Sequence, residues 1–146
     1  MNTITIYYAD DDEDDLSFFS DAIAKIKIDS DKEIYLHLYT SGIELVAELK
    51  DNKTSNCLVF LDINMPCKSG FEILQEIKSE PATKNLPTIM FSTSSDTDSV
   101  SKCQWFGATH YVVKPFEFGT LIKILSTLIA TDWSNYQSEN DIFVIK

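Results

Sequence analysis

Short apolar runs alternate along this chain with longer segments in which apolar residues recur every three or four positions. The first run is ITIYYA (4–9), and the residues at helical spacing after it are Leu16, Phe19, Ile23 and Ile26. A short apolar run is typical of a buried strand, whereas the three–four spacing is typical of an amphipathic helix. Because the two patterns alternate five times, the chain is predicted to form an α/β domain with a parallel sheet.

The other elements follow from the same patterns. Further strands are predicted at residues 33–39, 57–61, 88–92 and 110–113, and further helices near residues 43–49, 71–78, 96–106 and 117–129. The run CLVFL (57–61) is apolar throughout, as expected of a central strand covered on both faces. Ser41 and Ser69 each precede a glutamate by three positions, which is capping-box spacing, and Gly107 is placed to end the fourth helix.

Composition excludes several classes of protein. The 146 residues are 44% hydrophobic and 24% charged, close to the average of a soluble globular domain. The net charge of −11 argues against nucleic acid or an anionic membrane as a direct partner. No apolar run approaches the roughly 18 residues needed to cross a bilayer, and the N-terminus lacks the basic-then-apolar order of a signal peptide. Cys57, Cys67 and Cys103 lack metal-ligand spacing. We therefore expect free thiols and a cytoplasmic location.

Polar residues follow four of the five predicted strands. Asp10 and Asp11 come after the first strand, Asp62 after the third, Ser92 ends the fourth, and Lys114 comes after the fifth. The carboxyl ends of parallel strands meet at one edge of the sheet, where ligands of such folds bind. The sequence therefore predicts that three carboxylates, a hydroxyl and an ammonium converge there.

This set of groups suits phosphoryl transfer to a carboxylate. An aspartate can act as the nucleophile and form an acyl phosphate. Magnesium takes oxygen ligands from carboxylates and offsets the repulsion between two anions. A lysine and a hydroxyl can hold the remaining phosphate oxygens.

The six consecutive acids from Asp10 to Asp15 have two interpretations, a solvated charge run or a cation site. We assign the cation to Asp10 and Asp11, because they leave the strand directly after Ala9. Asp12 replaces one of them if the strand is one residue longer. The other acids are expected in the loop or first turn of the helix, where they favour its dipole.

The stretch VFLDINMPCKSGFEIL, with Asp62 followed by Asn64, Pro66 and Gly70, carries a family resemblance. Together with the acidic pair, PTIMFSTS and GATHYVVKPF, it resembles the CheY-like receiver domain of two-component response regulators over about residues 3 to 130. The resemblance implies a flavodoxin-like, doubly wound five-stranded parallel sheet of order 2-1-3-4-5 with five helices. We expect a stand-alone regulator, with a receiver domain at 1–130 and a C-terminal extension without an effector domain at 131–146.

The resemblance also implies the roles of individual residues. Asp62 is expected to be phosphorylated, Ser92 to bind a phosphate oxygen and Lys114 to pair with the phosphoryl group. The expected ligands of Mg²⁺ or Mn²⁺ are Asp10, Asp11, Asp62 and the backbone carbonyl of Asn64.

Other family positions concern the switch. Tyr111 occupies the aromatic switch position, where the ring turns inward as the Ser92 hydroxyl moves toward the phosphate. Asn64 and Ser94 resemble positions that tune phosphate lifetime. The Lys114–Pro115 bond resembles one that is usually cis in this family.

The function implied is that of a phospho-acceptor in a two-component system or phosphorelay, a signalling protein rather than an enzyme. A sensor histidine kinase or a histidine phosphotransfer domain would supply the phosphoryl group, and a downstream protein would read a surface of helix four, strand five and helix five. We expect no direct nucleic-acid or membrane partner. A homodimer would form through that surface, or through IFVIK (142–146) if it adds a strand or an apolar patch to a neighbour.

Two other functions compete with this one. The first is a pseudo-receiver that serves only as an interaction module, and the complete acid, hydroxyl and lysine set argues against it. The second is a haloacid-dehalogenase-type phosphatase, whose motif has a second aspartate where this chain has Asn64.

Overall fold

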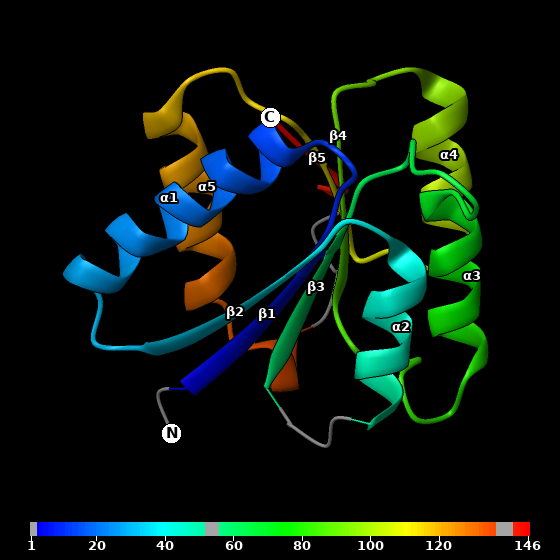
Figure 1. The fold of residues 1–146 in the computed structure, drawn as a ribbon, viewed down its shortest axis with the longest axis horizontal. Coiled ribbons are helices and arrows are strands. Elements are labelled where there is room, and N and C mark those ends of the chain that lie inside the picture. Colours follow the sequence, from blue (N-terminus) through cyan, green and yellow to red (C-terminus); the bar gives the residue numbers. More distant parts are fainter. Residues whose placement is uncertain (1–2, 52–55, 137–141) are drawn as a thin grey trace.

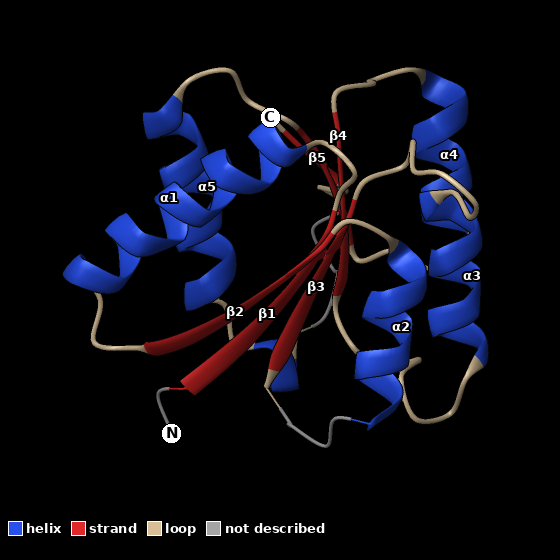
Figure 2. Ribbon diagram, viewed as in Figure 1, coloured by secondary structure: helices blue, strands red, loops and turns tan. Residues whose placement is uncertain are grey.

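The computed structural model describes residues 3–51, 56–136 and 142–146 and contains one parallel sheet (Figures 1 and 2). Its strands are β1 (Thr3–Ala9), β2 (Glu33–Tyr39), β3 (Cys57–Leu61), β4 (Thr88–Ser92), β5 (His110–Val113) and β6 (Val144–Ile145). The strand order is β2-β1-β3-β4-β5-β6, and every pairing is parallel. The predicted order 2-1-3-4-5 is confirmed, with one short strand added beside β5.

Helices cover both faces of this sheet. They are α1 (Glu13–Asp29), α2 (Gly42–Asp51), α3 (Gly70–Ser79), α4 (Thr97–Trp105) and α5 (Phe118–Ala130). Figure 1 shows α1 and α5 on one side and α2, α3 and α4 on the other. None of the described helices is both long enough and apolar enough to cross a bilayer.

Each face of the sheet has its own core, because side chains alternate along the strands. Beneath α1 and α5 an aromatic group surrounds Phe19, whose ring lies 4.3 Å from that of Tyr8 and 5.1 Å from that of Phe60. The core beneath the other three helices is mainly aliphatic. The strand β3 contributes to both cores and is buried along its whole length, as its apolar sequence predicts.

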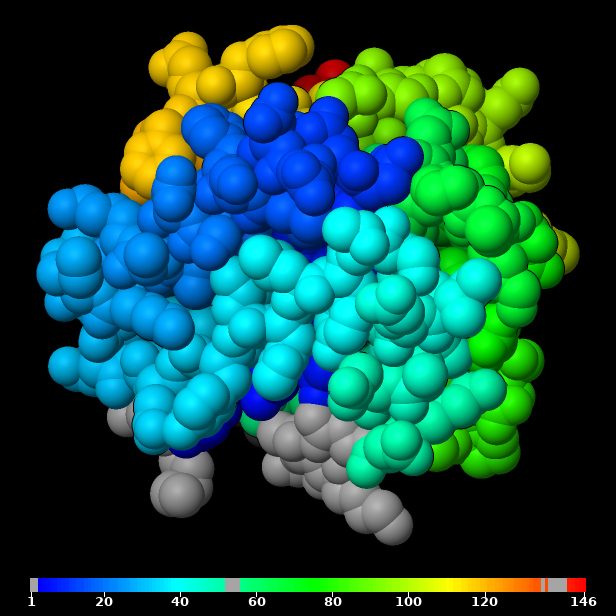
Figure 3. Space-filling view, in the orientation of Figure 1, coloured from blue at the N-terminus to red at the C-terminus, as the bar shows by residue number. Residues whose placement is uncertain are grey.

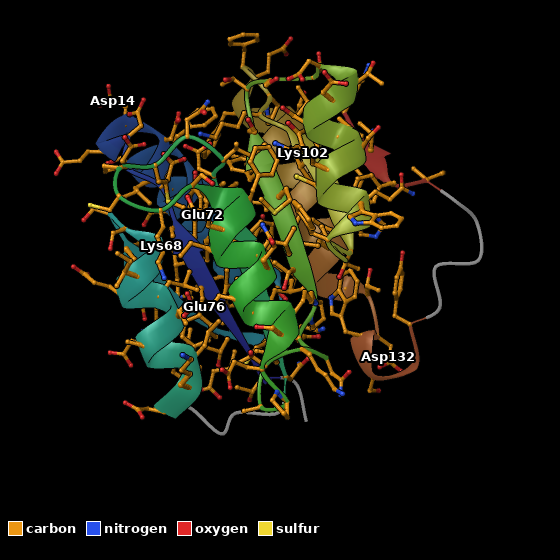
Figure 4. The ribbon with its side chains drawn as sticks, turned by 90° about the vertical axis from the view of Figure 1, so that its right-hand side faces the viewer. Asp14, Lys68, Glu72, Glu76, Lys102 and Asp132 are labelled. Carbon is orange, nitrogen blue, oxygen red and sulfur yellow. The ribbon has the colours of Figure 1, made fainter. Side chains whose placement is uncertain are left out.

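The capping predictions at Ser69 and Gly107 agree with the structure, and at Ser41 one of the two hydrogen bonds of a capping box is present. Ser69 and Glu72 form both hydrogen bonds of a capping box at the start of α3. Ser41 accepts a hydrogen bond from the Glu44 backbone N–H at 3.4 Å. Gly107 follows α4 with a φ of 95°, a conformation that favours glycine. On the surface of α3, Lys68 Nζ pairs with Glu76 Oε1 at 2.9 Å (Figure 4).

The end of the chain packs against β5. The backbone N–H of Tyr111 donates to the Phe143 carbonyl at 2.9 Å, and Val144 lies beside Tyr111 in the parallel register. The hydroxyl of Tyr136 lies 2.8 Å from Nε2 of His110, which also belongs to β5. Residues 137–141 of the predicted extension lie outside the described residues.

Val144–Ile145, part of IFVIK, adds a strand to the chain's own sheet. The physical reason is that β5 would otherwise be an edge strand with unpaired backbone groups, and a segment tethered nearby reaches it at high effective concentration. The homodimer through IFVIK stays a prediction.

We expect Gly70→Ala to lower the free energy of unfolding by roughly 1–3 kcal/mol or more, measured by urea denaturation. A Cβ at this position would lie 2.2 Å from the Asp62 carbonyl oxygen and 2.8 Å from the Ile63 Cα, and both are backbone atoms. Gly119→Ala is the matched control, because nothing lies within 4 Å of a Cβ there. That change should stabilise α5 by about 0.4–1 kcal/mol. Equal effects of the two substitutions would contradict this packing.

Candidate functional site

Two of the predicted acids are held side by side by the sheet. Asp10 follows β1 and donates its backbone N–H to the Tyr39 carbonyl at 3.0 Å, and Asp62 follows β3 and donates to the Ala9 carbonyl at 3.0 Å. These bonds continue the ladders beyond the strands and fix the two residues against each other. Asp10 is fully buried and Asp62 is 7% exposed, while Asp11 is exposed at the rim.

The carboxylates of Asp10, Asp11 and Asp62 form one cluster, with one oxygen from each lying within 4.8 Å of the others. Asp12 is not part of this cluster. It is the N-cap of α1, and its Oδ1 accepts the backbone N–H groups of Asp14 at 2.9 Å and Asp15 at 3.3 Å. Capping occupies the Asp12 side chain, which favours Asp10 and Asp11 over Asp12 as the predicted cation ligands.

Lys114 reaches into the same cluster from the end of β5. Its Nζ lies 2.7 Å from Asp10 Oδ2, 2.7 Å from Asp15 Oδ2 and 3.5 Å from Asp62 Oδ1. Its backbone N–H donates to the Ser92 carbonyl at 2.8 Å, which ties the ends of β4 and β5 together. Burial opposes the charge on the ammonium. The hydrogen bonds to Asp10 and Asp15 and the charge of Asp62 outweigh burial and raise the pKa of Lys114 above its ordinary value.

For the Asp62 carboxyl, burial outweighs the effect of the neighbouring lysine on its pKa. Burial raises the pKa of its carboxyl from 3.8 to about 7, against the lowering effect of Lys114, and the charge of Asp10 raises it further. One buried ammonium does not compensate several carboxylates, so the site carries excess negative charge at neutral pH. An added cation would relieve that excess.

Ser92 ends β4, and Tyr111 is the second residue of the neighbouring strand β5. Ser92 is buried, and its Oγ accepts the Ser94 backbone N–H at 3.2 Å. The Tyr111 ring is fully buried and turned inward, and its hydroxyl donates to the Ser94 carbonyl at 2.7 Å. Burial raises the pKa of this phenol. The two predicted switch residues therefore meet at Ser94, whose own hydroxyl donates to the Asp96 carboxylate.

The loop after Asp62 is tightly folded. The backbone N–H of Gly70 donates to the Ile63 carbonyl at 2.7 Å, and Cys67 has a φ of 68°. Asn64 is exposed in this loop. The absence of a Cβ at position 70 lets the start of α3 approach the backbone of Asp62 and Ile63.

The expected cis bond at Lys114–Pro115 is wrong for this structure, which contains no cis peptide bond among the described residues. The trans form of an X–Pro bond is favoured by about 0.5–1 kcal/mol when nothing opposes it. With the trans bond, Lys114 still reaches Asp10 and Asp15 at 2.7 Å.

Two residues in the site were not predicted from the sequence. Asp15, in the first turn of α1, pairs with Lys114, and the only sequence signal is its membership of the acidic run. The buried Tyr8 hydroxyl donates to Asp10 Oδ2 at 2.5 Å. Burial and the Asp10 charge raise the pKa of Tyr8. The sequence signal at Tyr8 is an aromatic residue in a strand position where aliphatic residues are common.

A doubly wound parallel sheet with this acidic cluster and lysine at its carboxyl edge has the architecture of a signalling receiver domain. The sequence model of the response regulator receiver domain matches residues 6–126, and the chain belongs to that family. It is therefore a receiver domain of two-component signalling, as the motifs around Asp62 and Lys114 predict.

Curated relatives fall within this family or contain regions similar to it. The chain is 29% identical over 143 residues to a probable cyclic di-GMP phosphodiesterase of Vibrio cholerae, covering 96% of this chain and 29% of that protein. Over 75 residues it is 32% identical to response regulator Rcp1 of Synechocystis sp., covering 51% of each chain. The chain spans less than a third of the length of several relatives that it matches.

Solved structures agree on the fold. The phosphorylated cyanobacterial phytochrome response regulator RcpA is 27% identical, with a TM-score of 0.74, covering 85% of this chain and 89% of that one. The Mn²⁺-bound form of response regulator Rcp1 is 22% identical, with a TM-score of 0.74, covering 91% and 96%. The second likeness shows the fold alone.

We expect Asp62→Asn to raise the free energy of unfolding in EDTA at pH 8 by roughly 2–4 kcal/mol, because the amide removes a charge that burial disfavours. A carboxyl whose pKa is raised on folding binds more protons in the folded state, so the stability of the wild type falls as pH rises from about 4 to about 7. The gain in the free energy of unfolding from Asp62→Asn should therefore shrink as the pH falls from about 7 to about 4, and it should disappear at lower pH. Urea titrations at pH 4, 6 and 8 test this, and an advantage independent of pH would contradict it.

Proposed function

We propose that this chain is a response regulator that accepts a phosphoryl group on Asp62 and thereby switches a protein-binding surface. The observation that carries the proposal is the convergence of Asp10, Asp11 and Asp62 with Lys114 at one edge of the sheet. Figure 3 places the start of α1 (blue) at this edge, between the segment after β5 (yellow) and the loop before α3 (green). A phosphoryl donor would approach the site from here.

The cluster fits Mg²⁺ or Mn²⁺, because its donor atoms are carboxylate oxygens close enough together to share one ion. Asp10, Asp11 and Asp62 would hold the cation, with the backbone carbonyl of Asn64 as a further ligand. When bound, the cation supplies positive charge that offsets repulsion between Asp62 and the incoming phosphoryl group.

The chain's own residues would carry the transfer. A carboxylate oxygen of Asp62 forms a bond to phosphorus as the bond between phosphorus and the donor atom breaks, leaving an acyl phosphate on Asp62. Lys114 would pair with one phosphoryl oxygen. The Ser92 hydroxyl accepts a hydrogen bond from the Ser94 backbone N–H, and its own proton would turn to another phosphoryl oxygen. Asn64 and Ser94, two positions beyond Asp62 and Ser92, would tune the lifetime of the acyl phosphate.

The output would pass through Tyr111 to the surface of α4, β5 and α5. Movement of Ser92 toward a phosphoryl group would change the contacts at Ser94, where the Tyr111 hydroxyl is held. In this chain β6 forms the edge of the sheet next to β5, so a downstream protein or a second copy would meet β6 at that edge.

The signalling context follows from the same site. A histidine kinase or a histidine phosphotransfer domain in the cytoplasm would supply the phosphoryl group, with the receiver unit at residues 1–130 and residues 131–146 as an extension. Neither nucleic acid nor a membrane would be a direct partner, because the net charge of −11 repels both.

The decisive experiment is the mass of the intact protein after incubation with acetyl phosphate and Mg²⁺. We expect one added phosphoryl group, absent with EDTA and absent from Asp62→Asn, because transfer needs both the nucleophile and the cation. Addition that persists in Asp62→Asn would refute Asp62 as the acceptor. A folded protein that binds Mg²⁺ but gains no mass from acetyl phosphate or from kinases would instead be a pseudo-receiver.

A further inference from the structure

Asp15 has a contact that the proposed function does not use. Its Oδ2 lies 2.7 Å from Lys114 Nζ, whereas Asp62 Oδ1 lies 3.5 Å from the same nitrogen. The Lys114 side chain is only 9% exposed, so its ammonium depends on these partners rather than on water. The closest contacts of the ammonium are therefore with Asp10 and Asp15, and the proposed acceptor Asp62 is a more distant partner.

The start of α1 fixes Asp15 in this position. Its backbone N–H donates to the Asp12 carboxylate at 3.3 Å, so the N-cap that begins the helix also orients the first turn. A carboxylate in the first turn is favoured by the helix dipole. Asp15 is thus held at the site by α1, outside the cluster of Asp10, Asp11 and Asp62.

Lys114 is the group for which the partners compete. In the proposed function Asp10 and Asp62 bind the cation, and a phosphoryl group on Asp62 pairs with the Lys114 ammonium. Of the described ion-pair partners of Lys114, Asp15 is the one outside the cation cluster, so it would still compete with the phosphoryl group for the ammonium.

We propose that Asp15 is a positioning residue that holds the Lys114 ammonium on the α1 side of the site. It thereby favours binding of the divalent cation and opposes binding of the phosphoryl group. This inference rests on the proposed function, because it concerns the same lysine and the same acceptor.

Removing the Asp15 charge has consequences of opposite sign for the two ligands. Without Asp15, the Lys114 ammonium pairs more strongly with Asp10 and Asp62 and competes with the cation, and the site also loses a negative charge. Both effects weaken cation binding. The same two changes strengthen the binding of an anionic phosphoryl group, which gains the ammonium and meets less repulsion. A merely structural role for Asp15 would weaken both kinds of binding.

Asp14 provides the matched control. It is the adjacent residue in the same helical turn, it is exposed, and Lys114 has no ion pair with it among the described contacts (Figure 4). Asp14→Asn therefore removes the same charge from the same helix without freeing Lys114. Asp15→Glu keeps the charge and should retain most of the wild-type behaviour.

The test is binding by the full chain of Mn²⁺, followed by electron paramagnetic resonance of the free ion, and of beryllofluoride with saturating Mg²⁺, followed by ¹⁹F NMR. For Asp15→Asn we expect about two- to fivefold weaker Mn²⁺ binding and about two- to fivefold tighter beryllofluoride binding. Asp14→Asn should change both by less than half as much.

Each other outcome overturns the inference. Equal effects of Asp14→Asn and Asp15→Asn, or weaker binding of both ligands by Asp15→Asn, would show that Asp15 does not act through Lys114. If the wild type binds Mn²⁺ but no beryllofluoride, the proposed phosphoryl acceptor itself fails, and this inference fails with it. Since the wild type is measured first, the two failures are distinguishable.

Discussion

The ion pairs of the buried Lys114 are the interaction on which the site depends. Its ammonium contacts Asp10 and Asp15 at 2.7 Å and Asp62 at 3.5 Å, and it is almost closed to water. Placing a buried charge without a partner costs several kcal/mol, so neither the lysine nor the carboxylates are stable there alone. Because one ammonium faces several carboxylates, the pairing is incomplete at neutral pH. Burial, and to a smaller extent the charge of Asp10, raise the pKa of Asp62, and a divalent cation or protonation would relieve the excess negative charge.

The pairing of the strands and the packing of the core hold these charged side chains in position. Parallel pairing brings the ends of β1, β3, β4 and β5 to one edge, and ladder bonds beyond the strands hold Asp10 and Asp62 in place. The hydrogen bond from the Lys114 backbone N–H to the Ser92 carbonyl likewise holds the ends of β4 and β5 together on the other side of the site. The aromatic core beneath α1 supports the Tyr8 ring, whose hydroxyl bonds to Asp10. Packing on one face of the sheet is thus linked directly to the orientation of a carboxylate in the site.

The local patterns predicted most of this architecture, because periodicity and strand ends are properties of nearby residues. The strand at 57–61, the capping box of Ser69 and the first-turn position of the acids after Asp12 all agree with the structure. Sequence could not decide features that depend on distant contacts. The pairing of Asp15 with Lys114 joins residues 99 positions apart. The strand β6 forms because the edge of β5 is nearby in space. A strand of two residues is too short for its hydrophobic pattern to predict which strand it pairs with.

The most direct test of the central role of Lys114 is the free energy of unfolding of Lys114→Met, measured by urea denaturation at pH 8 with EDTA and with saturating Mg²⁺. Methionine keeps much of the volume and removes the charge, so buried carboxylates lose their partner. In EDTA we expect a loss of about 3 kcal/mol or more relative to the wild type. Magnesium should recover most of it, because the cation replaces the missing positive charge. A variant as stable as the wild type in EDTA, with no greater gain from Mg²⁺, would contradict the account.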